Sequence, residues 1–343
     1  MHIVLVDDSI PFDGHSPTSQ PLGGAEKAFA SLPGALARRG HRVQVFNRCG
    51  DRLQIEGASW ETWHGIRPSA CDVLIAYRRP ELLGFVASAS HRLLWLATPA
   101  GYLEEEQRQR HLAAHRPTLV FMGEAHRATY RSTNVELPLA VVPPGIRRDY
   151  LDDAGPAPAH PPYAVATSHP QLGLDWLIRV WTARAHPLCP HAELRLYSAV
   201  LDRAFLGGVV QDRFKAIAAV ALAAGGQGVT IHRPAADPLM AEAYRGARAH
   251  LYPGDSHEVH CHTLAESQAC GLPAVARTFA ATAEQLGDRL SGTLADAEEA
   301  FARATLSLLE DDQAYLRQSE AARARAHGRT WDAAAAAFEA IWR

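Results

Sequence analysis

Apolar residues follow one another along the chain in a way that predicts strands alternating with helices. Residues 2–6 form a short, β-branched apolar run of the kind that is buried in a parallel sheet. A polar loop with Pro and Gly leads to Gly23 and Gly24. We then expect a helix over 25–39 and a strand over 41–46, which together make one βαβ unit. The loop is long for such a unit, and long loops at this place are usually functional.

The remainder of the first half continues the same alternation. Pro33 and Gly34 lie inside the expected helix, so a kink or a break is predicted there. Short apolar runs predict further strands at 72–76, 92–96, 118–122 and 140–143, with a charged helix at 103–115.

A second alternating half begins after a change in composition at residues 152–162, which are rich in Pro, Gly and Ala, as interdomain linkers are. Strands are then expected at 163–167, 193–197, 229–232, 250–252 and 273–277, helices at 172–185, 209–224, 239–247 and 262–270, and a helical tail at 297–343. Two such halves predict two Rossmann-like α/β domains facing a cleft. Ligands bind such sheets beyond the carboxyl ends of the strands, so the loops there are the places to search for chemistry.

Composition and charge exclude some classes of protein. The formal net charge of −3 provides no basic field for nucleic acid or for an anionic membrane. The five cysteines include no CxxC pair, which indicates a reduced, cytoplasmic compartment. The first residues do not read as a signal peptide, and no apolar run is long enough to cross a membrane, so we expect at most peripheral membrane association. Lysine occurs only as Lys27 and Lys215, which leaves few candidates for a phosphate-binding lysine.

Residues 255–276 carry the most informative pattern in the chain. Glu258 lies in a polar turn after a strand, and Glu266 follows inside a helix that ends at Gly-Leu-Pro. The free amides at the start of this helix, around Cys261 and Thr263, are suited to a phosphate. The two carboxylates could then hold hydroxyl groups on either side of a pyrophosphate.

This segment resembles the donor-binding motif of family 4 GT-B glycosyltransferases, in which two glutamates are separated by seven residues and followed by a Gly-Leu-Pro-type sequence. The resemblance implies that Glu258 contacts the donor sugar, as the candidate catalytic residue, and that Glu266 contacts the ribose hydroxyls. The alternative is that both acids are solvated turn and helix residues before a common helix stop.

Other segments look like the same family over nearly the whole length. Gly23 and Gly24 match a loop that closes on the donor, where glycine permits close approach and positive φ. Residues 141–146 are similar to the family's V-x-P-N-G-I-D, with Pro144 in place of the asparagine. The resemblance implies a GT-B fold with an acceptor domain at 1–155 and a donor domain at 156–330. It further implies a helix at 331–343 that crosses back to the first domain.

The sequence departs from the family where a basic pair should neutralise the donor pyrophosphate. Leu172 stands at the lysine position, and the arginine position falls at Thr167 or Ser168. Each missing charge-assisted hydrogen bond is worth about 1.5–3 kcal/mol. Four residues are candidates to replace the pair: Arg233, Arg277, Lys215 and His169. The donor-binding residues that we expect are Gly23, Gly24, Glu266, His262, Thr263, Arg233 and Ser168.

A cluster of histidines near the motif invites a metal interpretation. His257, His260 and His262 lie close to Cys261 and Glu258, but the spacing is not HExxH. Successive residues in a tight turn also point in different directions. We therefore expect neither a metal nor a cofactor. One of these histidines could instead partly replace the missing lysine. Donor binding would then weaken as the pH rises through the histidine range and the ring loses its proton.

These features together predict an enzyme of the EC 2.4 class, a hexosyl- or related transferase of polysaccharide biosynthesis. It would move a sugar from a UDP-, GDP- or ADP-sugar to a hydroxyl group of a carbohydrate or another acceptor. Retention of anomeric configuration is implied by the resemblance. A binding protein that keeps the GT-B fold without catalysis is the alternative, and the missing basic pair favours it. A nucleotide-sugar epimerase is a third possibility, which the Gly-Leu-Pro after Glu266 disfavours.

Overall fold

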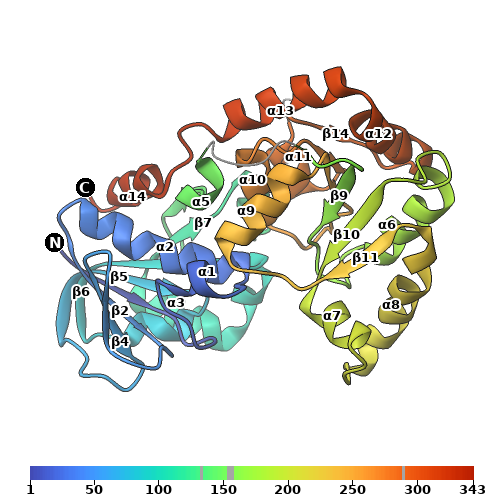
Figure 1. Cartoon of the computed structure of the whole chain (residues 1–343). Helices are drawn as coiled ribbons and strands as arrows, with labels where there is room; N and C mark the ends of the chain where they lie inside the picture. Colours follow the sequence, from blue (N-terminus) through green and yellow to red (C-terminus); the bar gives the residue numbers. More distant parts are fainter. Residues whose placement is uncertain (132–133, 153–157, 288–289) are drawn as a thin grey trace. The chain divides into compact units, whose positions relative to one another are not determined.

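The computed structural model describes residues 1–131, 134–152, 158–287 and 290–343, and these form two compact units (Figure 1). Unit 1 comprises residues 1–147 and 328–343, and unit 2 comprises residues 148–327. The predicted domain boundary at 155 and much of the expected linker fall on 153–157, outside the described residues. The assignment of the units to acceptor and donor stays a prediction.

Unit 1 is built on an eight-stranded sheet in the order β3-β4-β2-β1-β5-β6-β7-β8, in which only the β3–β4 pair is antiparallel. Its strands are β1 (His2–Val6), β2 (Arg42–Asn47), β3 (Leu53–Ile55), β4 (Ala58–Thr62), β5 (Ala70–Tyr77), β6 (Ser88–Trp95), β7 (Thr118–Phe121) and β8 (Leu139–Val141). Its helices are α1 (Ser16–Ser19), α2 (Gly24–Arg38), α3 (Glu106–His115), α4 (Glu124–Arg127) and α14 (Trp331–Glu339), with single 3-10 segments η1 (Pro80–Gly84) and η2 (Ala100–Glu104).

The core of unit 1 explains the apolar run at the start of the chain. Ile3 and Leu5 of β1 pack into one buried cluster with Phe29 of α2, while Val4 and Val6 face a second cluster on the other side of the sheet. A strand buried on both faces needs a continuous apolar sequence rather than an alternating one. The strand predicted at 2–6 is therefore confirmed.

Helix α2 continues without interruption through Pro33, so the break expected there is wrong. Pro33 cannot donate a backbone hydrogen bond, which by itself disfavours a helix interior. The surrounding residues of α2 are buried, and the helix packs against α14 within unit 1. This tertiary packing offsets the local penalty.

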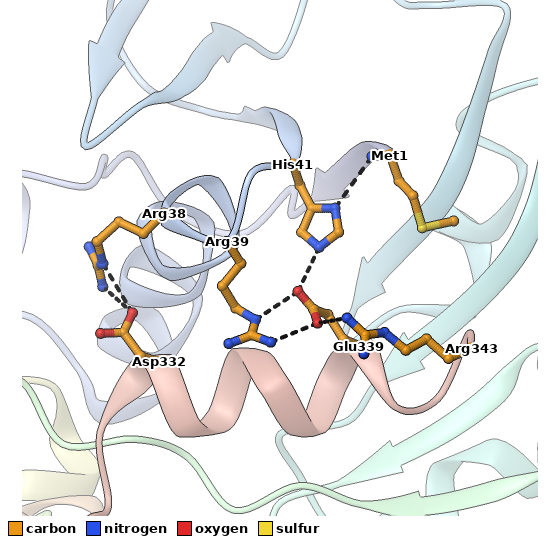
Figure 2. A network of polar contacts seen from close by, with 7 residues as sticks. All are labelled: Met1, Arg38, Arg39, His41, Asp332, Glu339 and Arg343. Atoms are coloured by element: carbon orange, nitrogen blue, oxygen red, sulfur yellow. Dashed lines mark hydrogen bonds and ion pairs between the residues drawn. The ribbon is translucent and has the colours of Figure 1, made fainter.

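A polar network joins α2 to α14 around one buried carboxylate, Glu339 (Figure 2). Arg39 donates to both of its oxygens, at 2.7 and 2.8 Å, and Arg343 donates at 2.8 Å. His41 Nε2 also lies 2.8 Å from the carboxylate. The hydrogen bonds from Arg39 and then His41 lower the pKa of Glu339 to about 2. The C-terminal helix is thus tied to unit 1 by a charge that must remain ionised.

Unit 2 contains a six-stranded parallel sheet in the order β11-β10-β9-β12-β13-β14 (Figure 1). Its strands are β9 (Tyr163–Ala166), β10 (Glu193–Tyr197), β11 (Val229–His232), β12 (Ala249–Tyr252), β13 (Ala274–Ala276) and β14 (Gly292–Leu294). Its helices are α5 (Arg148–Leu151), α6 (Leu174–Val180), α7 (Ala199–Phe205), α8 (Asp212–Ala223), α9 (Asp237–Gly246), α10 (His262–Ala269), α11 (Ala280–Gln285), α12 (Glu298–Glu310) and α13 (Asp312–Ala326), with a π-helical turn η3 (Trp181–Ala185) and a 3-10 turn η4 (Ala224–Gln227).

The strand order of unit 2 determines which loops are neighbours. Strand β12 lies between β9 and β13, and all three strands run in the same direction. The loops that follow them therefore leave the sheet at the same edge. The motif with Glu258 follows β12, at the centre of this group.

Candidate functional site

Three loops meet at the carboxyl edge of the unit 2 sheet, after β9, β12 and β13. Gly173 and Gly254 have positive φ, +74° and +63°, which only glycine adopts readily. A Cβ atom on Gly173 would lie 3.0 Å from Pro253 Cβ, and one on Gly254 would lie 3.0 Å from Phe279 Cδ2. The three loops are consequently packed directly against one another.

Glu258 has a fixed carboxylate in the loop between β12 and α10. The Tyr252 hydroxyl donates to one of its oxygens, and the backbone N–H of Asp255 donates to the other at 3.1 Å. Partial burial raises the pKa of Glu258, and the nearby charge of Asp255 acts in the same direction. Glu258 is therefore not a freely solvated turn residue, and its remaining lone pairs can accept from a hydroxyl group.

Glu266 lies in the middle of α10 and is only 8% exposed. Helix α10 packs on α5, α9 and α13 within unit 2. Burial, and next the charge of Glu266, raise the pKa of the Tyr150 and Tyr244 hydroxyls. A solvated helix residue would not have this environment, which contradicts that alternative for Glu266. Its contact with a ribose stays a prediction.

A buried polar chain ties the start of α10 to the loop after β9. Thr167 Oγ1 lies 2.9 Å from Thr263 Oγ1 and 3.1 Å from His250 Nε2, while Ser267 Oγ lies 2.7 Å from His250 Nδ1. His250 is fully buried, and this burial lowers its pKa to about 3, so the ring is neutral. The Ser267 hydroxyl donates to the Leu264 carbonyl at 3.0 Å, so it accepts from His250 Nδ1–H, and Nε2 of the neutral ring is the acceptor that faces Thr167 Oγ1.

This polar chain fixes the direction of the first turn of α10, where the side chain of the N-cap residue, Cys261, makes no capping hydrogen bond in the described structure. The sequence analysis included Thr263 but not His250 or Thr167 as a positioning group. A histidine within the apolar strand 249–252 was the signal that could have found it.

Ser168 lies beside Thr167 and is 7% exposed. Its hydroxyl is buried and has no hydrogen-bond partner in the described part of the chain. A buried hydroxyl without a partner costs free energy, which a bound acceptor would recover. The structure brings this predicted residue to the same edge as Glu258.

The histidines of the motif do not converge on a common point. His257 is exposed, and its Nδ1 lies 2.7 Å from Asp255. The rings of His260 and His262 pack edge to face, with centroids 4.6 Å apart. Within the described ranges, no group of three or more His, Cys, Asp or Glu side chains is arranged to hold a metal ion.

The four candidate cations have different surroundings. Lys215 is exposed on α8 and pairs with Asp212 at 2.7 Å. Burial lowers the pKa of His169, which favours its neutral form. Arg233 is exposed after β11, three strands away from β12. Arg277 directly follows β13, the neighbour of β12.

Gly23 and Gly24 lie in unit 1 at the start of α2. Gly23 precedes the helix with φ −66°, so the positive φ that the sequence suggested is not used there. A Cβ atom on Gly23 would lie 2.3 Å from Glu26 Oε2, so a larger residue here would require the Glu26 side chain to move. Glu26 is itself held by Arg78 at 2.6 Å. The contact of this loop with a donor stays a prediction.

Comparison with known proteins identifies the family of the segment that contains this edge. The family model for "Glycosyl transferases group 1" matches residues 204–325, which include Glu258, Glu266 and Arg277. The match thus covers the part of unit 2 that holds the Glu258 and Glu266 motif. The family resemblance of the motif is thereby confirmed.

One curated relative matches part of the chain. The chain is 33% identical over 112 residues to the D-inositol 3-phosphate glycosyltransferase of Xylanimonas cellulosilytica. The match covers 32% of this chain and 27% of that relative, so the chain spans about a quarter of the relative's length.

Solved structures match over nearly the whole chain. WaaG, a glycosyltransferase involved in lipopolysaccharide biosynthesis, has a TM-score of 0.70 at 15% identity, with 99% of both chains covered. HepE from Anabaena, in complex with UDP and glucose, has a TM-score of 0.72 at 15% identity, again over 99% of both chains. The sucrose-phosphate synthase from Thermosynechococcus elongatus has a TM-score of 0.71 at 15% identity and covers 100% of this chain and 98% of its own. The predicted GT-B fold is confirmed. None of the helices in the described ranges has the length and apolar character to traverse a bilayer.

Proposed function

We propose that the chain is a glycosyltransferase that moves a sugar from a nucleotide-diphosphate sugar to a hydroxyl acceptor. The observation that carries this proposal is the carboxyl edge of unit 2. There a fixed Glu258 carboxylate and the Ser168 hydroxyl, which has no partner among the described residues, lie in neighbouring loops beside the start of α10. Amides at a helix start favour phosphate, and a fixed carboxylate favours sugar hydroxyls.

In this proposal each group of the edge has one task. Glu258 accepts hydrogen bonds from the donor sugar, and Glu266 accepts from the ribose. Ser168 and the first turn of α10, with His262 and Thr263, hold the diphosphate and stabilise the charge that develops as it leaves. We assign no side-chain nucleophile. We propose retention of configuration and no requirement for a metal or a cofactor.

The substrates are proposed by analogy with the matched proteins. HepE was solved with UDP and glucose, and by analogy we propose a UDP-hexose as the first donor to test among the UDP-, GDP- and ADP-sugars. WaaG is involved in lipopolysaccharide biosynthesis, so a carbohydrate acceptor in polysaccharide biosynthesis is the matching proposal. We also propose that the protein is cytoplasmic, with at most peripheral membrane association.

A second candidate is a catalytically impaired GT-B protein that binds a sugar nucleotide. It is favoured by Leu172, Thr167 and Ser168, which occupy the positions of the family's basic pair. Without that charge the diphosphate would be a poorer leaving group, although it could still bind.

One experiment separates the two candidates. The protein is incubated with UDP-, GDP- and ADP-glucose, and the release of nucleoside diphosphate is followed by chromatography, together with thermal shifts for the free nucleotides. A glycosyltransferase should release one nucleoside diphosphate slowly, by hydrolysis, and Glu258→Gln should abolish that release. A thermal shift without turnover, including with sugar acceptors, would favour the binding protein. No shift with any nucleotide would contradict both.

A further inference from the structure

The diphosphate at the proposed site needs more positive charge than a helix start supplies. The first turn of α10 contributes only a partial charge, about half an elementary charge. Leu172 and its neighbours contribute none. A full cation from another part of unit 2 would have to compensate for it.

Arg277 is in the right place for this task. Strand β13 pairs with β12 from His250–Ala274 to Tyr252–Ala276, so Arg277 leaves the sheet one residue after the last pair, next to the loop of Glu258. The backbone N–H of Arg277 donates to the Tyr252 carbonyl at 3.1 Å, which extends that pairing. The loops 167–173, 253–261 and 277–279 contain no other arginine or lysine.

The guanidinium of Arg277 is held between two aromatic rings. Its central carbon lies 4.9 Å from the ring centre of Trp176 and 5.0 Å from that of Phe279. Phe279 is the residue that packs on Gly254, at the start of the loop that carries Glu258. Stacking of this kind orients the planar guanidinium and lowers the entropy that a bound anion must overcome.

One nitrogen of the same guanidinium, Nε, is buried and has no acceptor among the described residues. The positive charge contributes to the lowered pKa of Asp255, after the hydrogen bonds from His257, but Asp255 makes its ion pair with His257. A buried, charged donor without an acceptor is costly, and an arginine is well matched to phosphate oxygens.

We propose that Arg277 is the cation that binds the donor's diphosphate, in place of the basic pair that this chain lacks. This inference rests on the proposed function. When the bond between the anomeric carbon and the phosphate oxygen breaks, its electron pair stays on that oxygen, beside Arg277. The acceptor oxygen forms the new bond to the anomeric carbon, and its hydroxyl proton passes to the departing phosphate oxygen.

The test compares ligands with and without the diphosphate. Affinities for UDP, GDP and ADP, and for uridine, guanosine and adenosine, are measured by calorimetry for the wild type and Arg277→Gln. We expect the best-bound diphosphate to lose about 10- to 100-fold in affinity, while the matching nucleoside changes less than about twofold. Arg277→Lys should recover part of the loss, because it keeps the charge without the planar fork. Arg184→Gln, at a partly exposed arginine in η3 that pairs with Glu299 at 2.9 Å, is the matched control and should leave both affinities unchanged.

The outcomes separate this inference from the proposed function. Unchanged diphosphate affinity in Arg277→Gln would overturn the inference and leave the proposed function intact. An equal loss for diphosphate and nucleoside would also overturn it, because it would show that Arg277 only supports the loops. If Arg277→Gln does not fold, Arg277→Lys decides, since it must still weaken the diphosphate more than the nucleoside. A wild type that binds none of the six ligands would refute the proposed function itself.

Discussion

The buried carboxylate of Glu339 offers a sharp test of how the C-terminal helix is held in unit 1. Glu339→Gln keeps the size of the side chain and removes its charge. The four short contacts from Arg39, His41 and Arg343 then lose their charged acceptor. An NH2 group also replaces one carboxylate oxygen, and its hydrogens face the donors that this oxygen accepted from. The variant should therefore be less stable at neutral pH.

The size of the loss follows from the exposure of the partners. Hydrogen bonds to charged groups contribute about 1.5–3 kcal/mol each, but solvent screens pairs at the surface. The Arg343 side chain is 75% exposed and that of Arg39 is 32% exposed, whereas that of Glu339 is 3% exposed. We expect a net loss of about 1–2 kcal/mol in the free energy of unfolding of unit 1.

The lowered pKa of Glu339 determines how its contribution to stability changes with pH. The pKa of Glu339 is lowered to about 2 in the folded protein from the ordinary glutamate value of 4.5. The unfolded chain therefore binds the proton more readily, and the stabilisation is present above about pH 4.5 and is lost as the pH falls toward 2. Urea unfolding of the wild type and Glu339→Gln should differ at pH 5 and converge near pH 2.5.

Asp332→Asn is the control. Asp332 lies on α14, as Glu339 does, but its ion pair with Arg38 of α2, at 2.9 Å, is exposed. This substitution should cost less than about 0.5 kcal/mol. A difference between wild type and Glu339→Gln that is absent at pH 5, or that does not shrink toward pH 2.5, would refute the reasoning.

Further predictions concern the edge of unit 2. Glu258→Gln should lower turnover by about 100-fold or more and leave nucleoside diphosphate affinity nearly unchanged; a parallel loss of both would contradict a role at the sugar. Because the pKa of Glu258 is raised by burial, turnover should fall on the acid side at a higher pH than an ordinary glutamate would give, as a pH–rate profile can show. Thr167→Val should cost about 1–3 kcal/mol, measured by urea unfolding, because it leaves the buried His250 Nε2 without its hydrogen-bond partner. Thr230→Val, on β11, is the control, and an equal loss there would count against the buried polar chain.

The sequence predicted the parts of the fold that depend on local pattern. Apolar runs identified β1 and β12, because strands buried on both faces leave a continuous signal. No strand was predicted at β3, β4 or β14, which are short and pair with neighbouring strands. It also placed a break at Pro33, where packing against α14 outweighs the local preference.

The candidate site likewise has parts that the sequence predicted and parts that it did not. Glu258 and Glu266 were found because they belong to a motif contiguous in sequence. The polar chain through His250 was not found, since Thr167 and Thr263 are 96 residues apart and meet only through the strand order. Arg277 was one of four equal candidates until the pairing of β13 with β12 set it beside the loop of Glu258.

Hydrogen–deuterium exchange with and without a nucleoside diphosphate tests the central claim most directly, because it reports on the backbone amides themselves. The claim is that the amides at the start of α10 bind the phosphates. UDP, GDP or ADP, whichever binds best, should slow exchange in a peptide spanning 258–268, and the matching nucleoside should slow it much less. Saturating binding that leaves the exchange of this peptide unchanged, with protection elsewhere in the chain, would contradict the account.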